Sequence, residues 1–267
     1  MPADLRLCRS LLFLPASNPR AIAKAKGLAA DMVVLDLEDA VKPADKQSAR
    51  ASAVEAAAAG FPGLCAIRIN ALEPWHSADL EAVAGSRADY LVVPMTPGPE
   101  APRSAAAAAG KPVLAMIETA RGVLAAAAIA PETAGLIAGT NDLAADLGLP
   151  PGAGREALAT ALQTVILAAR AAGVAAFDGV YNRLDDEEGF AAQCEEGKSF
   201  GFDGKSLIHP DQVETANRLF GPTGEEVEAA RRLLAAATGG AERFEGAMIE
   251  HMHVEQARWV LARARAA

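Results

Sequence analysis

The strongest constraint on the fold of this chain is a regular alternation between short apolar runs and amphipathic segments. Eight apolar runs of five to eight residues recur along the chain, at Ser10–Ala16, Met32–Asp39, Leu64–Ala71, Tyr90–Met95, Val113–Thr119, Leu136–Asp142, Val174–Tyr181 and Lys205–His209. Runs of this length, each followed by a helix-like segment, are typical of buried parallel strands. Eight such units predict an α/β fold of the (β/α)8 TIM-barrel type. A doubly wound open sheet is the alternative, but no dinucleotide-binding fingerprint follows the first strand.

The segments between these runs predict the outer helices and the end of the barrel. Helices are expected near 18–29, 43–59, 77–86, 97–109, 121–129, 154–172 and 185–199, with two more near 211–220 and 224–237 that complete and extend the ring. The pattern stops at Thr238-Gly239-Gly240, and Phe244–Ala266 then carries more apolar side chains than its own fold can bury. We therefore expect a catalytic barrel domain over 1–237. Residues 238–267 should form a C-terminal helical arm, either a lid over the barrel mouth or a contact with a neighbouring subunit.

Composition and charge narrow the classes of function. The chain has 267 residues, of which 51% are hydrophobic, so it can bury one large core. A formal net charge of −9 argues against a nucleic-acid partner. No stretch of about twenty uninterrupted apolar residues predicts a membrane span. The three cysteines are odd in number and lie in or beside apolar runs, which favours buried thiols and a cytoplasmic location.

Two of the apolar runs end in a carboxylate. Glu118 follows the fifth run and Asp142 ends the sixth, and the crossover between them should return both to the same edge of a parallel sheet. A carboxylate at such a rim must be paired, hydrogen-bonded or metal-bound, because desolvating it alone is costly. Two converging carboxylates suit Mg²⁺ or Mn²⁺. The alternative is that one acid pairs with a basic residue and the other caps the next helix.

The neighbouring runs add charges to the same rim. The second run ends in Asp36-Leu-Glu38-Asp39, and the third delivers Arg68. Carboxylates from adjacent strands repel one another unless a cation lies among them, so the crowding favours the metal site. The planar guanidinium of Arg68 suits a substrate carboxylate, and a rim salt bridge to one of the acids is its other possible role.

Other chemistries fit the sequence less well. Gly204-Lys205-Ser206 resembles the end of a P-loop, but Ser199 stands where the first glycine is required. His251 and His253 are two residues apart and face different sides of a helix. Lys205 could form a Schiff base, although we favour a lysine that holds a phosphate or an acid.

Several of these motifs together resemble a known enzyme family. They are Arg9-Ser-Leu-Leu-Phe-Leu-Pro15, Asp36-Leu-Glu-Asp-Ala-Val41, Arg68-Ile-Asn70, Ile117-Glu-Thr119, Gly139-Thr-Asn-Asp-Leu143 and Gly201-Phe-Asp-Gly-Lys-Ser-Leu-Ile-His-Pro210. As an ordered set, the chain resembles the citrate lyase β-subunit-like proteins of the HpcH/HpaI aldolase/citrate lyase superfamily, which also holds malyl-CoA and citramalyl-CoA lyases. The resemblance implies a Mg²⁺-dependent barrel that makes or breaks a carbon–carbon bond next to a thioester.

The resemblance also implies roles for residues at the rim. Glu118 and Asp142 match the family's metal ligands, with Mn²⁺ as a possible substitute for Mg²⁺. Arg68 matches the arginine that holds the carboxylate of a 2-oxo acid. Glu38 and Asp39 would orient metal-bound waters.

Further residues are assigned to coenzyme A and to proton transfer. The first fifty residues carry eight basic and six acidic side chains, and we expect Arg9, Lys42 and Lys46 to contact the CoA phosphates. CoA-dependent relatives carry an aspartate in a C-terminal Met-Ile-Asp motif that protonates the thioester enolate, often in a neighbouring subunit. This chain has Met248-Ile-Glu250 instead, and it has Met252 where a proline is usual. Glu250 is therefore the expected acid, with a solvated carboxylate at the start of the last helix as its alternative.

The expected activity is a lyase reaction on a 3-hydroxydicarboxylyl-CoA thioester such as citryl-, malyl- or citramalyl-CoA. The first alternative is the β subunit of a citrate lyase complex, which acts on an acyl-carrier-protein thioester. A second is a CoA-independent class II aldolase for pyruvate or oxaloacetate, and a third is a non-enzymatic binding module. An arm that reaches across subunits implies a homo-oligomer, a trimer or a hexamer.

Overall fold

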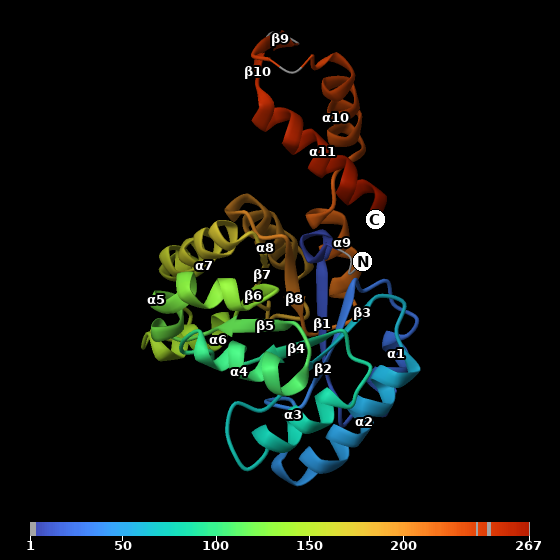
Figure 1. Cartoon of the computed structure of the whole chain (residues 1–267), viewed down its shortest axis with the longest axis vertical. Coiled ribbons are helices and arrows are strands. Elements are labelled where there is room, and N and C mark those ends of the chain that lie inside the picture. The colour runs from blue at the N-terminus through green and yellow to red at the C-terminus, as the bar shows by residue number, and fades with distance from the viewer. Residues whose placement is uncertain (1–3, 239, 245–246, 267) are drawn as a thin grey trace.

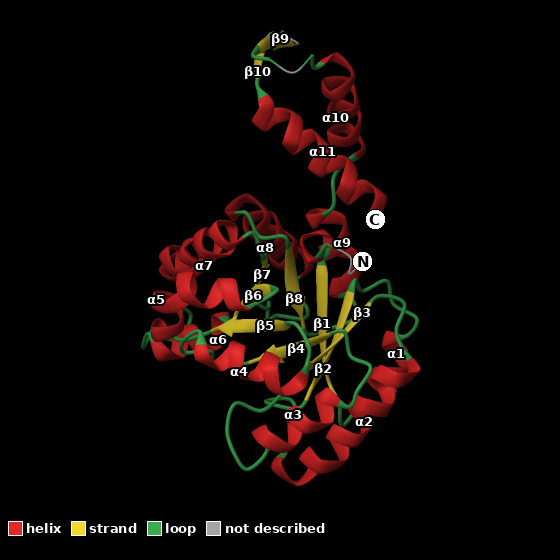
Figure 2. Cartoon of the chain, in the orientation of Figure 1, coloured by secondary structure: helices red, strands yellow, loops and turns green. Residues whose placement is uncertain are grey.

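Eight parallel strands close into a barrel in the computed structural model of the chain, which describes residues 4–238, 240–244 and 247–266 (Figures 1 and 2). They are β1 Ser10–Pro15, β2 Met32–Asp36, β3 Leu64–Arg68, β4 Tyr90–Val93, β5 Val113–Ile117, β6 Gly135–Ala138, β7 Ala175–Asp178 and β8 Gly204–Leu207. Each strand pairs with the next in sequence, and Leu11 of β1 lies opposite both Met32 of β2 and Ser206 of β8. The predicted (β/α)8 barrel is confirmed.

Most strands end earlier than the apolar runs suggest. The second run continues to Asp39, but β2 ends at Asp36. The carboxylate of Asp36 accepts hydrogen bonds from the backbone N–H groups of Glu38 (2.8 Å) and Ala40 (3.0 Å), which turns the chain away from the sheet. The sixth run likewise ends as a strand at Ala138. The rim acids therefore lie on loops and helix starts.

The ring around the barrel consists of helices that follow the strands. They are α1 Pro19–Ala25, α2 Lys46–Ala59, α3 His76–Ala84, α4 Glu100–Ala109, α5 Ala120–Ile129, α6 Thr140–Asp146, α7 Ala159–Ala172, α8 Glu187–Phe200 and α9 Gln212–Phe220. Side-chain caps begin several of them, since Asn18 accepts from the backbone of Arg20 and Ala21, and Thr119 accepts from that of Gly122. The short helix α6 was not expected, because its first residues continue the apolar run of β6.

The core has two layers, as the alternation of side chains along a strand requires. Inward-facing residues such as Leu11, Val34 and Phe177 fill the barrel, and the alternate residues pack between the sheet and the helices. The three cysteines are buried and unpaired, as expected. Within the described ranges no helix has the length and apolar character needed to cross a bilayer.

The C-terminal arm begins earlier than the expected boundary at 237. Helix α10 (Gly224–Ala236) packs against α11 (His251–Ala266) instead of extending the ring, and Figure 1 shows the pair projecting from the barrel. Two short antiparallel strands, β9 (Glu242–Phe244) and β10 (Ala247–Ile249), lie at the far end of the arm. Strands of three residues are too short to show an alternating pattern, so the sequence did not predict them.

Arg263 of α11 fixes the arm to the base of the barrel. Its guanidinium donates hydrogen bonds to the backbone carbonyls of Arg6 (3.0 Å), Asp203 (2.6 Å) and Phe220 (2.9 Å). Arg6 and Asp203 precede β1 and β8, so they lie at the amino ends of the strands, opposite the rim. The expectation of a lid over the mouth of the same barrel is therefore wrong, because the arm leaves from the other face.

Candidate active site

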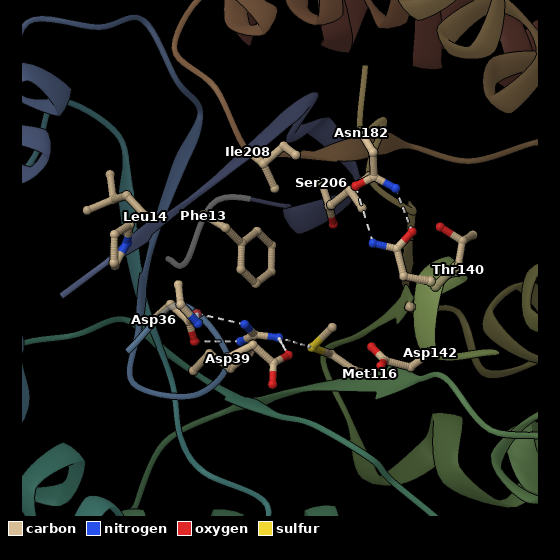
Figure 3. A pocket seen from close by; sticks show the side chains of 17 residues that line it. Phe13, Leu14, Asp36, Asp39, Met116, Thr140, Asp142, Asn182, Ser206 and Ile208 are labelled. Carbon is tan, nitrogen blue, oxygen red and sulfur yellow. Dashed lines mark hydrogen bonds and ion pairs between the residues drawn. The ribbon is translucent and has the colours of Figure 1, made fainter. Parts of the chain in front are cut away.

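A cavity of about 350 Å³ opens at the carboxyl ends of the strands, and we call it the rim pocket. One half of its lining is charged and includes Asp36, Asp39, Arg68 and Asp142. The other half is neutral and is lined by Phe13, Val180, Asn182, Ser206 and Ile208. Figure 3 shows this division, with Asp36 and Asp39 on one side of the Phe13 ring and Ser206 and Asn182 on the other. The pocket can therefore receive a ligand with one charged end and one uncharged end.

Arg68 is held in the charged half by a buried ion pair with Asp36. These residues are opposite each other in the β2–β3 register, and Nε and Nη2 of Arg68 donate to the two carboxylate oxygens of Asp36 at 2.6 and 2.7 Å. Burial disfavours the cation, but the Asp36 carboxylate outweighs it and raises the pKa of Arg68. Arg68 therefore stays charged.

The outer edge of Arg68 faces two more acids. Its Nη1 lies 3.2 Å from Glu38 Oε2 and 3.4 Å from Asp39 Oδ2. The rim salt bridge expected as the alternative role of Arg68 is present at its Nε edge, and the contact with a substrate carboxylate stays a prediction. A substrate carboxylate can reach only the outer edge, in competition with Glu38 and Asp39.

Burial and acidic neighbours raise the pKa of carboxyl groups in this cluster. Burial raises the pKa of Glu38 to about 8, with repulsion from Asp39 and Glu118 adding to the shift and Arg68 opposing it. Five carboxylates share the region, Asp36, Glu38, Asp39, Glu118 and Asp142, against the single arginine. Such an excess of negative charge is the electrostatic setting of a cation site.

Glu118 lies where the sequence places it, directly after β5. Its side chain is 2% exposed, and Oε1 accepts a hydrogen bond from the backbone N–H of Met95. Burial raises the pKa of Glu118 to about 7, and the nearby Asp142 raises it further. A Cβ at Gly139 would come within 2.4 Å of the Glu118 Oε2 atom, so the absence of a side chain at 139 makes room for this carboxylate.

Asp142 reaches the same region from a different element. It lies in the first turn of α6 and not at the end of a strand, so its side chain is exposed at the pocket. Burial and repulsion from Asp39 raise its pKa, and Arg68 opposes the shift. The helix start provides a second carboxylate beside Glu118.

The donor set fits a magnesium ion. In the described part of the chain, no three His, Cys, Asp or Glu side chains converge on one point, so the protein offers two carboxylates, those of Glu118 and Asp142. Mg²⁺ binds through one or two carboxylates and keeps the remaining positions for water and substrate. The raised pKa values and the space that Gly139 leaves for Glu118 both fit this arrangement.

The basic residues expected at the CoA phosphates are distributed differently. Arg9 lies at the base of the barrel, where Nε and Nη2 bind Asp31 at 2.8 and 2.9 Å, so the structure does not bring it to the rim pocket. Lys46 is buried, and its Nζ donates to the carbonyls of Leu37 and Glu38 and to Asn70 Oδ1 at 2.6–2.8 Å. Lys46 therefore fixes the loop that carries Glu38. Lys42 is exposed near the rim, and its predicted phosphate contact stays a prediction.

Lys205 points away from the rim pocket. It is fully buried between β8 and α8, where Nζ binds Asp178 Oδ2 (2.8 Å), the Gly179 carbonyl (2.6 Å) and Gln193 Oε1 (2.7 Å). Arg155 completes the group through a contact of 2.6 Å with the second oxygen of Asp178. Lys205 thus holds an acid, as favoured over a Schiff base, but the acid belongs to the protein.

Glu250 lies outside the rim pocket of its own chain. It follows β10 at the far end of the arm (Figure 1), and its backbone N–H donates to Nδ1 of His253 at 3.0 Å. The pocket lining contains no described residue of the arm. A role for Glu250 in catalysis therefore requires a second copy of the chain.

The neutral half of the pocket was missed by the sequence analysis. Asn141 and Asn182 bind each other through their side-chain amides at 2.7 and 3.3 Å across the pocket mouth, and Ser206 lies beside them (Figure 3). The eighth run was interpreted with Lys205 facing the rim, so the inward position of Ser206 was lost. Ser206 lies opposite Leu11, which faces inward, and this pairing shows that Ser206 faces inward too. The pairing can be recognised only when the strand register is known.

Known proteins resemble this chain over nearly its whole length. The family described as HpcH/HpaI aldolase/citrate lyase matches residues 9–210. A (3S)-malyl-CoA thioesterase of Cereibacter sphaeroides is 42% identical, over 97% of this chain and 95% of its own length. CitE of Mycobacterium tuberculosis, solved with magnesium, acetoacetate and coenzyme A, is 35% identical with a TM-score of 0.83, over 98% of this chain and all of that one.

A further solved structure shows the citrate lyase β subunit of M. tuberculosis with oxaloacetate and magnesium. It is 34% identical with a TM-score of 0.74, over 82% of this chain and all of that chain.

This chain belongs to the HpcH/HpaI aldolase/citrate lyase family. The expected resemblance, the barrel and the assignment to a lyase family of enzymes are confirmed. The expectation of magnesium and of small-molecule ligands agrees with what the solved relatives bind.

Proposed function

We propose that this protein is a Mg²⁺-dependent lyase that cleaves a 3-hydroxydicarboxylyl-CoA thioester, with (3S)-malyl-CoA as the first substrate to test. The observation that carries the proposal is the excess of carboxylates, some of them buried, around Arg68 at the rim, where burial raises the pKa of Glu118 to about 7. The match to relatives that bind magnesium, oxo acids and coenzyme A supports it.

The residues of the rim pocket have different roles in the proposed reaction. Mg²⁺ held by Glu118 and Asp142 would supply a Lewis acid to the oxygens of the hydroxy-acid end. Arg68 offers its outer edge to the substrate carboxylate, and Glu38 and Asp39 orient water beside it. Phe13 and Met116 line the space between the two halves and limit the access of water. The uncharged half receives the thioester.

Bond cleavage requires one proton to leave and one to arrive. The hydroxyl proton passes to water in the pocket as the carbon–carbon bond breaks. The hydroxyl-bearing carbon becomes the carbonyl carbon of the oxo acid, and the electron pair passes to the carbon beside the thioester. That carbon must be protonated to give the acyl-CoA. We assign this proton to Glu250 of a neighbouring subunit, because Glu250 follows β10 in the arm and no described residue of the arm lines the pocket of its own chain.

Thioester hydrolysis is the second candidate, and the (3S)-malyl-CoA thioesterases at 42% identity favour it. In that reaction water attacks the thioester carbonyl, and malate and free CoA are the products. The three cysteines are not placed to act as nucleophiles, because all are buried and none lines the rim pocket.

The products separate the two reactions. The protein is incubated with (3S)-malyl-CoA and Mg²⁺, and glyoxylate and free thiol are measured in the same samples. Glyoxylate without thiol supports the lyase, and thiol without glyoxylate supports the hydrolase. If neither the corresponding oxo acid (oxaloacetate, glyoxylate or pyruvate) nor free thiol forms with citryl-, malyl- or citramalyl-CoA, the proposal is wrong. Glu132→Gln, an exposed acid paired with Arg103, is the control for Glu118→Gln.

Mixing of two variants tests the role of Glu250 and the oligomer. We expect a trimer or hexamer in which Glu118→Gln and Glu250→Ala are each inactive alone. After unfolding and joint refolding, mixed oligomers should regain activity, because some intact pockets meet intact arms. A monomer in light scattering, or no recovery on mixing, would contradict the shared site.

A further inference from the structure

The hydroxyl of Ser206 is a buried donor without a partner in the rim pocket. Ser206 is 2% exposed, and its Oγ makes no hydrogen bond to any described residue. A buried hydroxyl without a protein partner is unfavourable unless a ligand or a water supplies one, so Ser206 marks a place in the pocket where a ligand atom can accept a hydrogen bond. It is the one atom of this kind that lines the rim pocket, among the residues that the structure describes.

The strand register explains why this hydroxyl faces the cavity. Lys205 and Leu207, its neighbours in β8, face the helices, so Ser206 faces the interior of the barrel at the height of the pocket. Figure 3 shows its side chain beside the ring of Phe13 and next to Asn182, across the pocket from Asp36 and Asp39. The amides of Asn182 and Asn141 already bind each other. Ser206 is therefore a buried hydroxyl in the neutral half of the pocket that has no hydrogen bond to a described residue.

We propose that Ser206 donates a hydrogen bond to the thioester carbonyl oxygen of the substrate and stabilises the negative charge that develops on it. The inference rests on the proposed function, because the charged half of the pocket takes the carboxylate end and leaves the uncharged thioester to this half. A neutral hydroxyl suits a carbonyl oxygen, which accepts hydrogen bonds and carries no charge before the reaction.

A hydrogen bond from Ser206 to the thioester oxygen would assist both carbon–carbon cleavage and thioester hydrolysis. In carbon–carbon cleavage the electron pair of the breaking bond delocalises onto the thioester oxygen, and the oxo acid leaves. In hydrolysis the attack of water places the pair on the same oxygen before CoA leaves as the thiol. A donor already aimed at this oxygen is worth more in the transition state than in the ground state.

Ser206 is a donor and not a nucleophile. No described histidine or carboxylate accepts a hydrogen bond from its Oγ, so no base is in place to remove its proton. An acyl group found on Ser206 by mass spectrometry during turnover would overturn the donor role.

The test compares Ser206→Ala with Ser10→Ala in the full-length protein. Ser10 is also a fully buried serine in the barrel, but it lies at the base, and its Oγ accepts the backbone N–H of Asp31 at 3.0 Å. For Ser206→Ala we expect kcat on (3S)-malyl-CoA to fall about 10²-fold, while Tm stays the same or rises. For Ser10→Ala we expect the reverse, a lower Tm with kcat unchanged. Equal kcat in Ser206→Ala and the wild type would overturn the proposal.

A spectroscopic measurement separates this inference from the proposed function. With Mg²⁺ and acetyl-CoA labelled with ¹³C at the carbonyl, the infrared band of the bound thioester should move to lower frequency in the wild type and in Ser10→Ala. The shift should be absent in Ser206→Ala. If the wild type shows no such shift, Ser206 has no contact with the carbonyl. If the shift is present but malyl-CoA is not cleaved, the proposed reaction fails and the inference about Ser206 stands.

Discussion

Two groups of charges lie at the carboxyl ends of the strands, and they differ in how far they are balanced. The buried ion network behind β7 and β8 places Asp178 between Lys205 and Arg155, with Gln193 and the Gly179 carbonyl completing the contacts of the lysine. In and beside the rim pocket, five described carboxylates lie around Arg68, three of them in the pocket lining. The network has partners for its charged groups, and it stabilises the barrel wall.

The unbalanced group is the one that can bind a ligand. A protein gains nothing in stability from crowded acids, since like charges repel and burial disfavours each of them. The rim contains such acids, and the raised pKa values of Glu38, Glu118 and Asp142 show that their charged forms are disfavoured there. Balance therefore distinguishes a structural charge cluster from a functional one in this molecule, and substitutions in the two groups should have opposite effects on stability.

The largest effect on stability is expected for Lys205→Met. The change leaves Asp178 buried with one cation fewer, which should lower the free energy of unfolding by about 3–5 kcal/mol. Urea denaturation measures it, with the exposed Lys24→Met as the control, expected within about 0.5 kcal/mol of the wild type. A Lys205→Met variant as stable as the wild type would show that the network is not structural.

Glu118→Gln should do the opposite at the rim. Removing one of the crowded acids should leave the unfolding free energy of the metal-free protein unchanged or higher. The wild type should gain about 5–10 °C in Tm with Mg²⁺ at a hundred times its Kd, and Glu118→Gln should lose this gain. An unchanged magnesium response in the variant would remove Glu118 from the metal site.

Gly139→Ala tests the space around Glu118 without altering a charge. The added Cβ would lie 2.4 Å from both Cβ and Oε2 of Glu118, which should cost about 1–3 kcal/mol and weaken the magnesium response. Gly85→Ala is the matched control, because its nearest atom would be 3.8 Å away and its φ is −81°. The control should be neutral or stabilising by about 0.4–1 kcal/mol. Equal behaviour of the two variants would show that the Gly139 backbone yields easily.

The smallest effect on stability is expected for Asp39→Asn. This side chain is 70% exposed at the outer edge of Arg68, so the free energy of unfolding should change by less than about 0.5 kcal/mol. Activity should fall, though by less than in Glu118→Gln, if Asp39 has the proposed role of orienting water and Glu118 that of binding the ion. Chemical denaturation and steady-state kinetics on the same preparation check both points.

The sequence predicts the barrel well because its signal is repeated eight times. It also places Glu118, since a charge directly after a fully apolar run has few explanations. Asp142 was expected at a strand end, but the run of β6 continues into α6, and both elements are apolar at their junction. An apolar run shows that residues are buried and does not show where a strand becomes a helix.

The sequence did not predict at which end of the barrel a side chain lies or in which direction it points. Arg9 and Lys46 are basic residues near β1 and β2, but Arg9 lies at the base with Asp31, and Lys46 is turned inward to Asn70. A shift of one residue along β8 exchanges Lys205 for Ser206 at the pocket. These assignments depend on pairing between distant segments, which a local pattern does not contain.

The attachment of the arm has a consequence for the order in which a new molecule is made. The three carbonyls that hold Arg263 come from segments before β1, before β8 and at the end of α9, and they meet only when the first and last strands are paired. While the chain is still being synthesised, the site on the barrel that binds its last helix is therefore incomplete. Arg263 can therefore make all three hydrogen bonds only after the barrel has closed, so we expect the arm to take its place on the barrel late in folding.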